Sequence, residues 1–406
     1  MKIRSITYFC IPSWPLEVKV LQEAGTFLAE AKGAFTAAGY EVQTLRLATI
    51  PFPHLLGPNK LAEAPQLAKM LGAASQATGI EYASLGPALP EVPESYLVIP
   101  EALTAAQNVF FSGVMADSRS GISLPAVRAC ADVIVKCASL TPDGFANLRF
   151  AALANVPPGA PFFPAAYHAV NAPAFALATE AADLAVEAFS GAKTITEGRQ
   201  ALVAALETHA HKLVAVADLL KYRYSLHFGG IDFSLAPFPE EARSLGAAFE
   251  RMGVPRLGLH GSLAAAAILT EAIACARFPH VGFSGLFLPV LEDSVLSKRA
   301  ADGTLTVKDL LLYSAVCGTG LDTVPLPGDT APEQIAALLL DLAALALRLD
   351  KPLTARLMPI PGKQAGEATG FDFAYFANSR VMRLDAEALG NALAGVETFA
   401  LQHRLR

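Results

Sequence analysis

The strongest constraint on the fold is the alternation of short apolar runs with longer amphipathic segments. Lys2 to Phe9 reads as a buried strand, Pro15 to Ala38 as an amphipathic helix and Glu41 to Ala48 as a second strand. This order is typical of a βαβ unit with parallel strands. Because 53% of the residues are hydrophobic and only 17% are charged, helices can cover such a sheet on both faces. We therefore predict an α/β protein.

The later part of the chain repeats this theme in three closely spaced passages. They are centred on residues 230, 260 and 290, and each is expected to place a strand end before a helix. No low-complexity linker and no fixed-period repeat divides residues 1–406. We therefore predict a single large domain, in which residues 1–145 form the N-terminal part and the later residues carry most of the motifs.

Composition excludes several classes of protein. The net charge is −6, from 37 acidic and 31 basic residues, which leaves no basic surface for nucleic acid or for a membrane. The most apolar stretch, 335–349, is shorter than the roughly 20 residues that cross a bilayer and is interrupted by Asp341 and Arg348. The five cysteines form no C-x-x-C pair, and the N-terminus lacks the apolar core of a signal peptide. We expect a cytoplasmic protein with reduced thiols.

The first candidate site lies in the segment HFGGIDFSLAPFP, residues 227–239. If this segment is a strand, Asp232 and Ser234 lie on the same face of it. A carboxylate and a hydroxyl on an otherwise apolar strand need polar partners or water, so they are candidates for a catalytic acid and a substrate-binding hydroxyl. The alternative is that Asp232 accepts backbone N–H groups at a turn.

The second candidate site is the run Gly258-Leu-His260-Gly261-Ser262. It predicts a strand that ends in a tight turn at Gly261, followed by a helix with Ser262 as its N-cap. Free N–H groups at such a helix start would bind an anionic group of a substrate, with His260 beside it as an acid or base. The alternative is a histidine that is bonded into the turn.

The third candidate site is the acidic pair Glu292-Asp293, which follows the apolar segment GFSGLFLPVL and precedes a helical stretch. One carboxylate is expected to cap that helix or to interact with its dipole. The other is then free to act as a general base or as a metal ligand. The alternative is that both carboxylates have only structural roles.

Several single residues complete the candidates. Cys317 precedes two glycines and is a candidate nucleophile, although the absence of a neighbouring histidine favours a packing role. His168 closes the loop PPGAPFFPAAYH and is a candidate metal ligand. Ser118, Arg119 and Arg356 are candidates for binding an anionic substrate.

Motifs of the common cofactor and hydrolase sites are absent from the chain. It contains no G-x-x-x-x-G-K-[ST], G-x-G-x-x-G, G-x-S-x-G or H-E-x-x-H pattern. Nucleotide cradles, hydrolase elbows and zinc-protease sites are therefore disfavoured.

The segments above resemble the bacterial and archaeal family called domain of unknown function 711. The resemblance rests on FGGIDFSLAPFP, GLHGSLAAAA, GFSGLFLPVLED, AVCGTGLDTVPLPGDT and TARLMPIPGK, in this order, with NVFFSGVMADSRSGISLPAV as a weaker match in the N-terminal third. The family implies a ten-stranded α/β barrel similar to that of pyruvate formate-lyase and other glycyl radical enzymes. It implies no settled activity, and a regulatory association has been suggested for some members.

The fold relationship raises the question of glycyl radical chemistry. Those enzymes need a cysteine on a loop inside the barrel and a glycine in a C-terminal segment that resembles Arg-Val-x-Gly-Tyr. Cys317 fits the first requirement, but the nearest C-terminal segment is Arg380-Val-Met-Arg383, with arginine in the place of the radical glycine. Radical chemistry is therefore disfavoured.

Two functions remain. The preferred one is an enzyme that gathers carboxylates and histidines at a barrel mouth for acid–base chemistry, as a hydrolase, lyase or isomerase, on a small polar or anionic substrate. A divalent metal held by His168, Glu292 and Asp293 is compatible with this site. The alternative is a non-catalytic regulatory protein that binds a small-molecule ligand in the same pocket. A homo-oligomer is compatible with either. The regulatory protein would need the helix start at Ser262 and an arginine. The enzyme requires its acids and bases to converge on one pocket, namely His168, Asp232, His260, Glu292 and Asp293.

Overall fold

The structure is a computed structural model that describes residues 1–169 and 172–403. It opens with β1 (Lys2–Cys10), α1 (Val18–Ala37) and β2 (Val42–Thr49). β1 and β2 pair in parallel, and α1 buries Phe27 and Phe35 on the side that faces the strands. The predicted βαβ unit is confirmed.

Eleven strands form one mixed sheet in the described part of the chain. The order along the sheet is β8-β7-β1-β2-β3-β4-β6-β10-β9, and β5 and β11 extend it from β4. β7 is antiparallel to β1 and β10 is antiparallel to β6, whereas β1 to β4 run parallel to one another. The remaining strands are β3 (Tyr82–Ala88), β4 (Val109–Asp117), β5 (Gly121–Ser123), β6 (Phe150–Ala154), β7 (Ala174–Glu180), β8 (His227–Asp232), β9 (Gly320–Pro327), β10 (Leu353–Ile360) and β11 (Thr398–Phe399).

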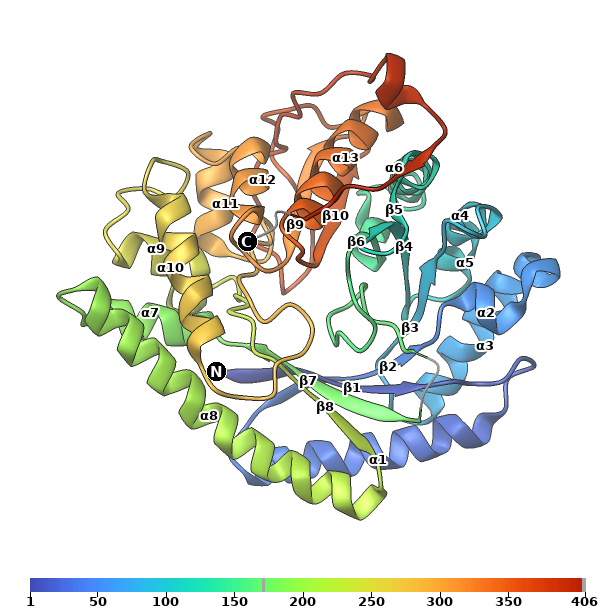
Figure 1. The fold of residues 1–406 in the computed structure, drawn as a ribbon, viewed down its shortest axis with the longest axis horizontal. Helices are drawn as coiled ribbons and strands as arrows, with labels where there is room; N and C mark the ends of the chain where they lie inside the picture. The colour runs from blue at the N-terminus through green and yellow to red at the C-terminus, as the bar shows by residue number, and fades with distance from the viewer. Residues whose placement is uncertain (170–171, 404–406) are drawn as a thin grey trace.

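The helices lie on the outer side of the strands. Figure 1 shows the two longest, α1 and α8, running along the outside of β1, β7 and β8, with α6 and α13 on the outside of β4, β6 and β10. The longer helices after α1 are α3 (Ala64–Ala77), α6 (Leu124–Ala138), α7 (Ala182–Ser190), α8 (Ile195–Tyr224), α10 (Ser262–Cys275), α11 (Ser294–Ala301), α12 (Val307–Ser314) and α13 (Pro332–Arg348). The short ones are α2 (Phe52–Leu56), α4 (Glu94–Leu97), α5 (Ile99–Ala105) and α9 (Leu245–Arg251).

The main hydrophobic cluster fills the layer between these helices and the sheet, as expected for strands that are covered by helices. The mixed α/β architecture and the single domain are confirmed. Among the helices of residues 1–169 and 172–403, none combines the length and the apolar character that a membrane crossing requires.

The inner side of the sheet is filled by loops. Phe162 and Phe163 belong to the Pro- and aromatic-rich loop between β6 and β7. The Phe162 ring lies 4.6 Å from the ring of Phe287, and the Phe163 ring lies 5.4 Å from that of Phe110 on β4. These contacts belong to two smaller hydrophobic clusters that are separate from the main one.

The segment 280–290 connects the two ends of the strand order. Isolated parallel bridges join Ile231 to His280, Leu235 to Leu286 and Pro289 to Asp322, so the segment lies between the β8 side and β9. The segment expected to form a strand before residue 290 therefore pairs with its neighbours through isolated bridges instead of a continuous strand. The strand expected before residue 260 is wrong, because residues 255–261 form a series of turns and bends.

Candidate functional site

Asp232 and Ser234 hold the segment 280–290 against β8. The Asp232 carboxylate is 1% exposed and accepts hydrogen bonds from Ser234 Oγ at 2.5 Å and from the N–H groups of Phe283 and Ser284 at 3.0 and 2.9 Å. Asp232 and Ser234 lie side by side, as expected for alternate residues of an extended segment. Burial raises the pKa of Asp232 above its ordinary value, and these hydrogen bonds offset only part of the effect. Each carboxylate oxygen of Asp232 accepts a backbone N–H group. The structure therefore agrees with the alternative in which Asp232 accepts backbone N–H groups at a turn.

Asp293 joins two helices. It is the N-cap of α11, where its carboxylate accepts the N–H groups of Val295 and Leu296, and it also accepts Ser244 Oγ at 2.5 Å and the N–H of Leu245 at 2.6 Å. The predicted capping role of one acid of the pair is confirmed. Asp293 is completely buried and its oxygens are saturated, so the structure gives it no free lone pair for a metal ion or a substrate.

His260 lies on an exposed loop rather than at a strand end. The N-cap of α10 is Gly261, with a φ of 103°, and not Ser262 as expected; the Ser262 hydroxyl instead accepts the N–H of Gly258 at 3.1 Å and donates to the Leu259 carbonyl at 2.8 Å. A four-residue turn of this kind satisfies the local backbone without a ligand.

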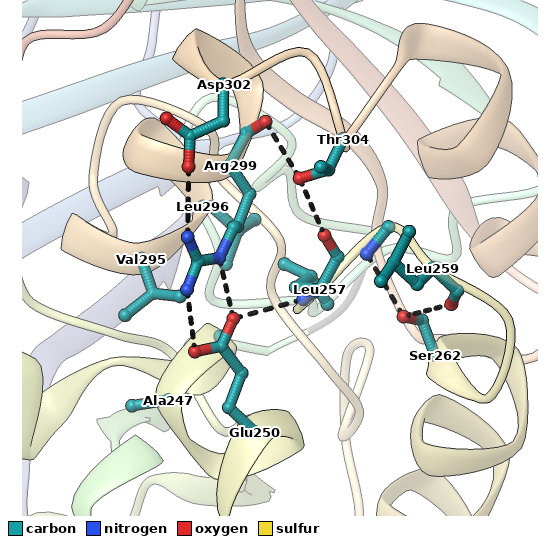
Figure 2. A network of polar contacts seen from close by, with 12 residues as sticks. Ala247, Glu250, Leu257, Leu259, Ser262, Val295, Leu296, Arg299, Asp302 and Thr304 are labelled. Carbon is teal, nitrogen blue, oxygen red and sulfur yellow. Dashed lines mark hydrogen bonds and ion pairs between the residues drawn. The ribbon is translucent and has the colours of Figure 1, made fainter. Parts of the chain in front are cut away.

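The same loop is anchored by an ion pair that Figure 2 shows in detail. Arg299 donates to both oxygens of Glu250, at 2.7 and 3.0 Å, and one of these oxygens also accepts the N–H of Leu257. Asp302 holds the guanidinium from the other side at 3.0 Å. This network holds the loop that carries His260 in place. Its hydrogen bonds join Arg299, Glu250, Asp302 and Leu257, and none of them involves Asp232 or Glu292.

Cys317 and its glycines serve close packing of the backbone. The Cys317 side chain is fully buried, and its carbonyl accepts a hydrogen bond from Lys351. A Cβ on Gly318 would lie 2.7 Å from the Cα of Gly285, so the two glycines allow two chain segments to touch. Gly318 therefore admits the backbone of segment 280–290, and Gly320, whose Cβ would lie 2.4 Å from the Thr354 carbonyl oxygen, admits that of β10. Both glycines serve contacts between chain segments.

His168, Ser118 and Arg119 lie at the opposite end of the sheet from Glu292. The N–H of His168 donates to Thr49 at the end of β2, and its ring is 6.0 Å from the ring of Phe9 near the end of β1. Ser118 and Arg119 are exposed just after β4, beside a cavity of about 410 Å³.

Glu292 by contrast binds Arg4, at the beginning of β1. Because Arg4 and Phe9 are five residues apart along one strand, the two ends are about 16 Å apart. The structure therefore does not assemble the expected metal set of His168, Glu292 and Asp293. In the described ranges, no three side chains of histidine, cysteine, aspartate or glutamate come together as a group that could hold a metal ion.

Glu292 is the one candidate acid that belongs to a buried cluster of charges. It is 4% exposed and pairs with Arg4 of β1 and with Arg356 of β10, the latter at 2.6 Å. Burial raises the pKa of Glu292, but the charges of Arg4 and Arg356 outweigh burial and hold it below its ordinary value. Glu292 is therefore an ionised partner of two arginines.

Asp322 occupies the far side of Arg356. Its Oδ1 accepts from Arg356 Nε at 2.6 Å, whereas its buried Oδ2 has no hydrogen-bond partner among the described residues. Burial raises the pKa of Asp322 above its ordinary value, and Glu292 contributes in the same direction. A buried carboxylate oxygen without a partner is unusual and marks a site where a proton or a water molecule is expected.

Arg46 on β2 adds a third guanidinium to the cluster but has no carboxylate partner. Its Nε donates to Thr44 Oγ1 at 2.8 Å, and neither Nη atom donates to any described residue. The guanidinium lies 5.1 Å from the ring centre of Phe163 and 5.9 Å from that of Tyr82. Burial, followed by the charge of Arg4, lowers the pKa of Arg46 to about 9, so the group is still charged at neutral pH.

Arg4, Arg46, Glu292 and Arg356 line one cavity of about 90 Å³, which we call the arginine pocket, whereas Asp322 lies behind Arg356 and does not line it. Its polar wall comes from the first halves of β1 and β2, from β10 and from the end of segment 280–292. Its aromatic wall comes from β3, β4, the loop between β6 and β7, and the segment after β10. The polar wall consists of Arg4, Gln43, Thr44, Arg46, Glu292 and Arg356, and the aromatic wall of Tyr82, Phe110, Phe163, Phe373 and Tyr375.

Sequence reasoning identified Glu292 and Arg356 of this pocket and missed Arg4 and Arg46. Both missed arginines interrupt strands that otherwise read as buried, in KIRSITYFC and VQTLRLAT. A charged residue in such a strand is rarely buried without a partner, and this rule is the signal that could have identified them.

Comparison with known proteins places the chain in a family. The family described as "Uncharacterised ACR (DUF711)" matches residues 1–377. A UPF0210 protein of Pyrobaculum islandicum is 33% identical over 81% of this chain and 76% of its own length. The UPF0210 proteins of Pyrobaculum arsenaticum and Methanopyrus kandleri are 37% and 31% identical, over 66% and 86% of this chain and 61% and 81% of their own lengths. The predicted resemblance is thereby confirmed, and the chain belongs to the DUF711 family.

Proposed function

We propose that the chain binds a small organic anion in the arginine pocket. The observation that carries the proposal is Arg46, a charged and partly exposed guanidinium in the pocket wall, neither Nη atom of which donates to a described protein acceptor. A charge that is partly removed from water and has no partner is costly, and proteins retain such groups where a ligand supplies the opposite charge. A carboxylate or phosphate oxygen fits the fork of a guanidinium better than any other common ligand group.

The charge balance of the pocket supports this proposal. Arg4 and Arg356 are neutralised by Glu292 and Asp322, so Arg46 supplies an excess positive charge. The ion pairs also hold Arg356 in place, because Arg356 is gripped by a carboxylate on each side. The result is a preorganised wall with one open guanidinium, as required for a binding site that loses little entropy on association.

An acid–base enzyme that acts on the bound anion is the first candidate for the biological role, and a ligand-responsive regulator is the second. The enzyme is supported by Asp322, a buried acid with one free oxygen and a raised pKa next to Arg356. In this proposal Arg46 holds the anion, Glu292 keeps Arg4 and Arg356 charged, and ionised Asp322 accepts a proton at its free Oδ2. A hydrolase, lyase or isomerase would each use a proton acceptor of this kind.

We propose as well that segment 280–290 is the tenth strand of a barrel like that of pyruvate formate-lyase. The bridges from this segment to Ile231, Leu235 and Asp322 support it, because they connect the β8 side and β9, the two ends of the strand order. Amide hydrogen exchange tests the idea. Val281 and Val290 donate to Ile231 and Asp322, so their amides should exchange far more slowly than those of the loop 252–261. Equal rates in both segments would mean that the sheet is open.

Binding is tested by a ligand-observed NMR titration of the full chain with acetate and with inorganic phosphate. At least one anion should bind, and Arg46→Met should weaken that binding by at least about tenfold, because two charge-assisted hydrogen bonds are lost. Arg251→Ala is the control, since this arginine is 54% exposed and forms only a long ion pair with Glu241. If neither anion binds, or if Arg119→Ala abolishes binding while Arg46→Met does not, the proposed site is wrong.

A further inference from the structure

The pocket contains a single uncommitted guanidinium. Glu292 and Asp322 occupy Arg4 and Arg356, the Gln43 amide donates to Glu180 at 2.5 Å, and Thr44 Oγ1 donates to the Arg4 carbonyl at 2.8 Å. Arg46 is therefore the guanidinium of the polar wall that has no carboxylate partner among the described residues. One planar fork matches one carboxylate through two parallel hydrogen bonds.

A phosphate fits this donor set poorly. Phosphate groups carry a charge of about −1.5 to −2 at pH 7 and three strong acceptor oxygens. A single excess guanidinium would leave part of that charge unpaired, next to aromatic rings that carry no positive charge. A dicarboxylate has the same difficulty with its second charge.

The surroundings of Arg46 suit an apolar body instead. Three rings follow one another along its side of the pocket, with centres 5.3 Å apart between Tyr82 and Phe110 and 5.4 Å apart between Phe110 and Phe163. Phe373 and Tyr375, from the segment after β10, complete the aromatic wall. Apolar groups of a ligand would lie against these rings and leave water.

The size of the cavity limits that body. Its volume is about 90 Å³, and an apolar cavity of about 150 Å³ is known to hold a benzene ring. A carboxylate with an aliphatic chain of a few carbons therefore fits inside, whereas a six-membered ring would extend from the cavity into solvent beside the partly exposed Tyr375.

We infer that the anion bound in the arginine pocket is a monocarboxylate with a short aliphatic chain. This inference rests on the proposed function and narrows it from any small anion to one chemical class. The carboxylate binds the Nη atoms of Arg46, and the chain of roughly two to four carbons packs against the aromatic wall.

The test is a ligand-observed NMR titration of the full chain with acetate, propionate, butyrate, benzoate, phosphate and succinate. Each added methylene from acetate to butyrate should tighten binding by roughly two- to fourfold. Butyrate should bind at least about tenfold more tightly than phosphate, succinate or benzoate, because these ligands leave a charge unpaired or exceed the cavity.

A pocket variant separates the aromatic wall from the charge. Tyr375 is 40% exposed, so Tyr375→Ala should leave the fold intact. In this variant acetate should bind as in the wild type, whereas the gain from acetate to butyrate should shrink by about half or more. Arg46→Met should weaken all carboxylates alike.

The outcomes distinguish the two levels of the argument. If phosphate, succinate or benzoate binds as tightly as butyrate and depends on Arg46, the monocarboxylate inference is wrong and the proposed function stands. If chain length makes no difference to affinity, the aromatic wall plays no part and the inference is again wrong. If no anion binds at all, both the inference and the proposed function are overturned.

Discussion

Replacement of Arg46 by methionine removes a charged group from the arginine pocket while retaining most of its length. If Arg46 is held for a ligand, the free protein bears a cost for this charge, and the variant should be more stable than the wild type. If Arg46 is structural, its removal should destabilise the protein. The sign of the stability change therefore tests the central argument without any knowledge of the ligand.

The magnitude follows from the pKa of Arg46. Burial and the charge of Arg4 lower that pKa from 12.5 to about 9, a difference that corresponds to about 5 kcal/mol of free energy. Solvent at the pocket mouth screens part of this penalty and leaves about 1–3 kcal/mol. Because the folded-state pKa lies below the unfolded-state pKa, the penalty is fully present below about pH 9 and disappears as the pH rises toward 12.5. The hydrogen bond to Thr44 offsets about 1 kcal/mol.

Urea unfolding at pH 7 is the assay, and Arg46→Met should raise the free energy of unfolding by up to about 2 kcal/mol. Arg149→Met is the matched control. Arg149 is a buried arginine at the end of the helical turn Phe145–Arg149, directly before β6, and its Nη1 donates to the carbonyls of Leu103 and Ala106 at 2.9 and 2.5 Å. Its removal orphans these buried carbonyls and should cost about 2–5 kcal/mol. If both variants lose stability to a similar extent, Arg46 is a structural residue and the reasoning is refuted.

Three further substitutions test the neighbouring contacts. Glu292→Gln removes the shared carboxylate of the buried Arg356 and the partly buried Arg4, so unfolding in urea should show a loss of about 3 kcal/mol at pH 7. The pKa of Glu292 is depressed, so this loss should shrink as the pH falls below 4.5. A loss that does not depend on pH would contradict the assigned charge. Asp322→Asn should change in the opposite direction, because a raised pKa makes the ionised form costly above that pKa. We expect a gain of up to about 1 kcal/mol at pH 7 and none in acid, measured by the same unfolding curves, and a loss at pH 7 would be inconsistent with this explanation. Gly282→Ala should lower the free energy of unfolding by about 3 kcal/mol or more, because its Cβ would lie 2.4 Å from Asp232 Oδ2 at a φ of +66°. Gly370→Ala is the control and should be near neutral, since no atom lies within 4 Å of its Cβ. Equal melting temperatures for the two variants would show that the packing between segment 280–290 and β8 is looser than described.

Local patterns in the sequence predicted several features of the candidate site correctly. Asp232 and Ser234 share one face of their segment because side chains alternate along an extended chain, and the structure joins them by a hydrogen bond. Asp293 caps α11 because an aspartate directly before a helix can accept its first free N–H groups. Each of these predictions depends only on residues within a few positions of one another.

The predictions that required long-range information were less successful. His260 has the local surroundings of a strand end, but residues 255–261 form turns at the surface, since the glycines on either side of it adopt left-handed conformations that end a strand. His168 and Glu292 both follow apolar segments and nevertheless lie at opposite ends of β1. The end of the sheet at which a loop emerges depends on strand direction, which periodicity does not reveal.

The sequence by itself determined the α/β class, the βαβ beginning and the family, because periodicity, composition and motifs are local or directly comparable properties of a chain. Only the tertiary structure decided that Arg4, Arg46 and Arg356 meet. The carboxylates of this cluster, Glu292 and Asp322, are hundreds of residues away from Arg4 in the chain. Charge pairing acts through space rather than along the sequence. The same distance dependence leaves Arg46 without a partner, and no local pattern distinguishes such an arginine from one on the surface.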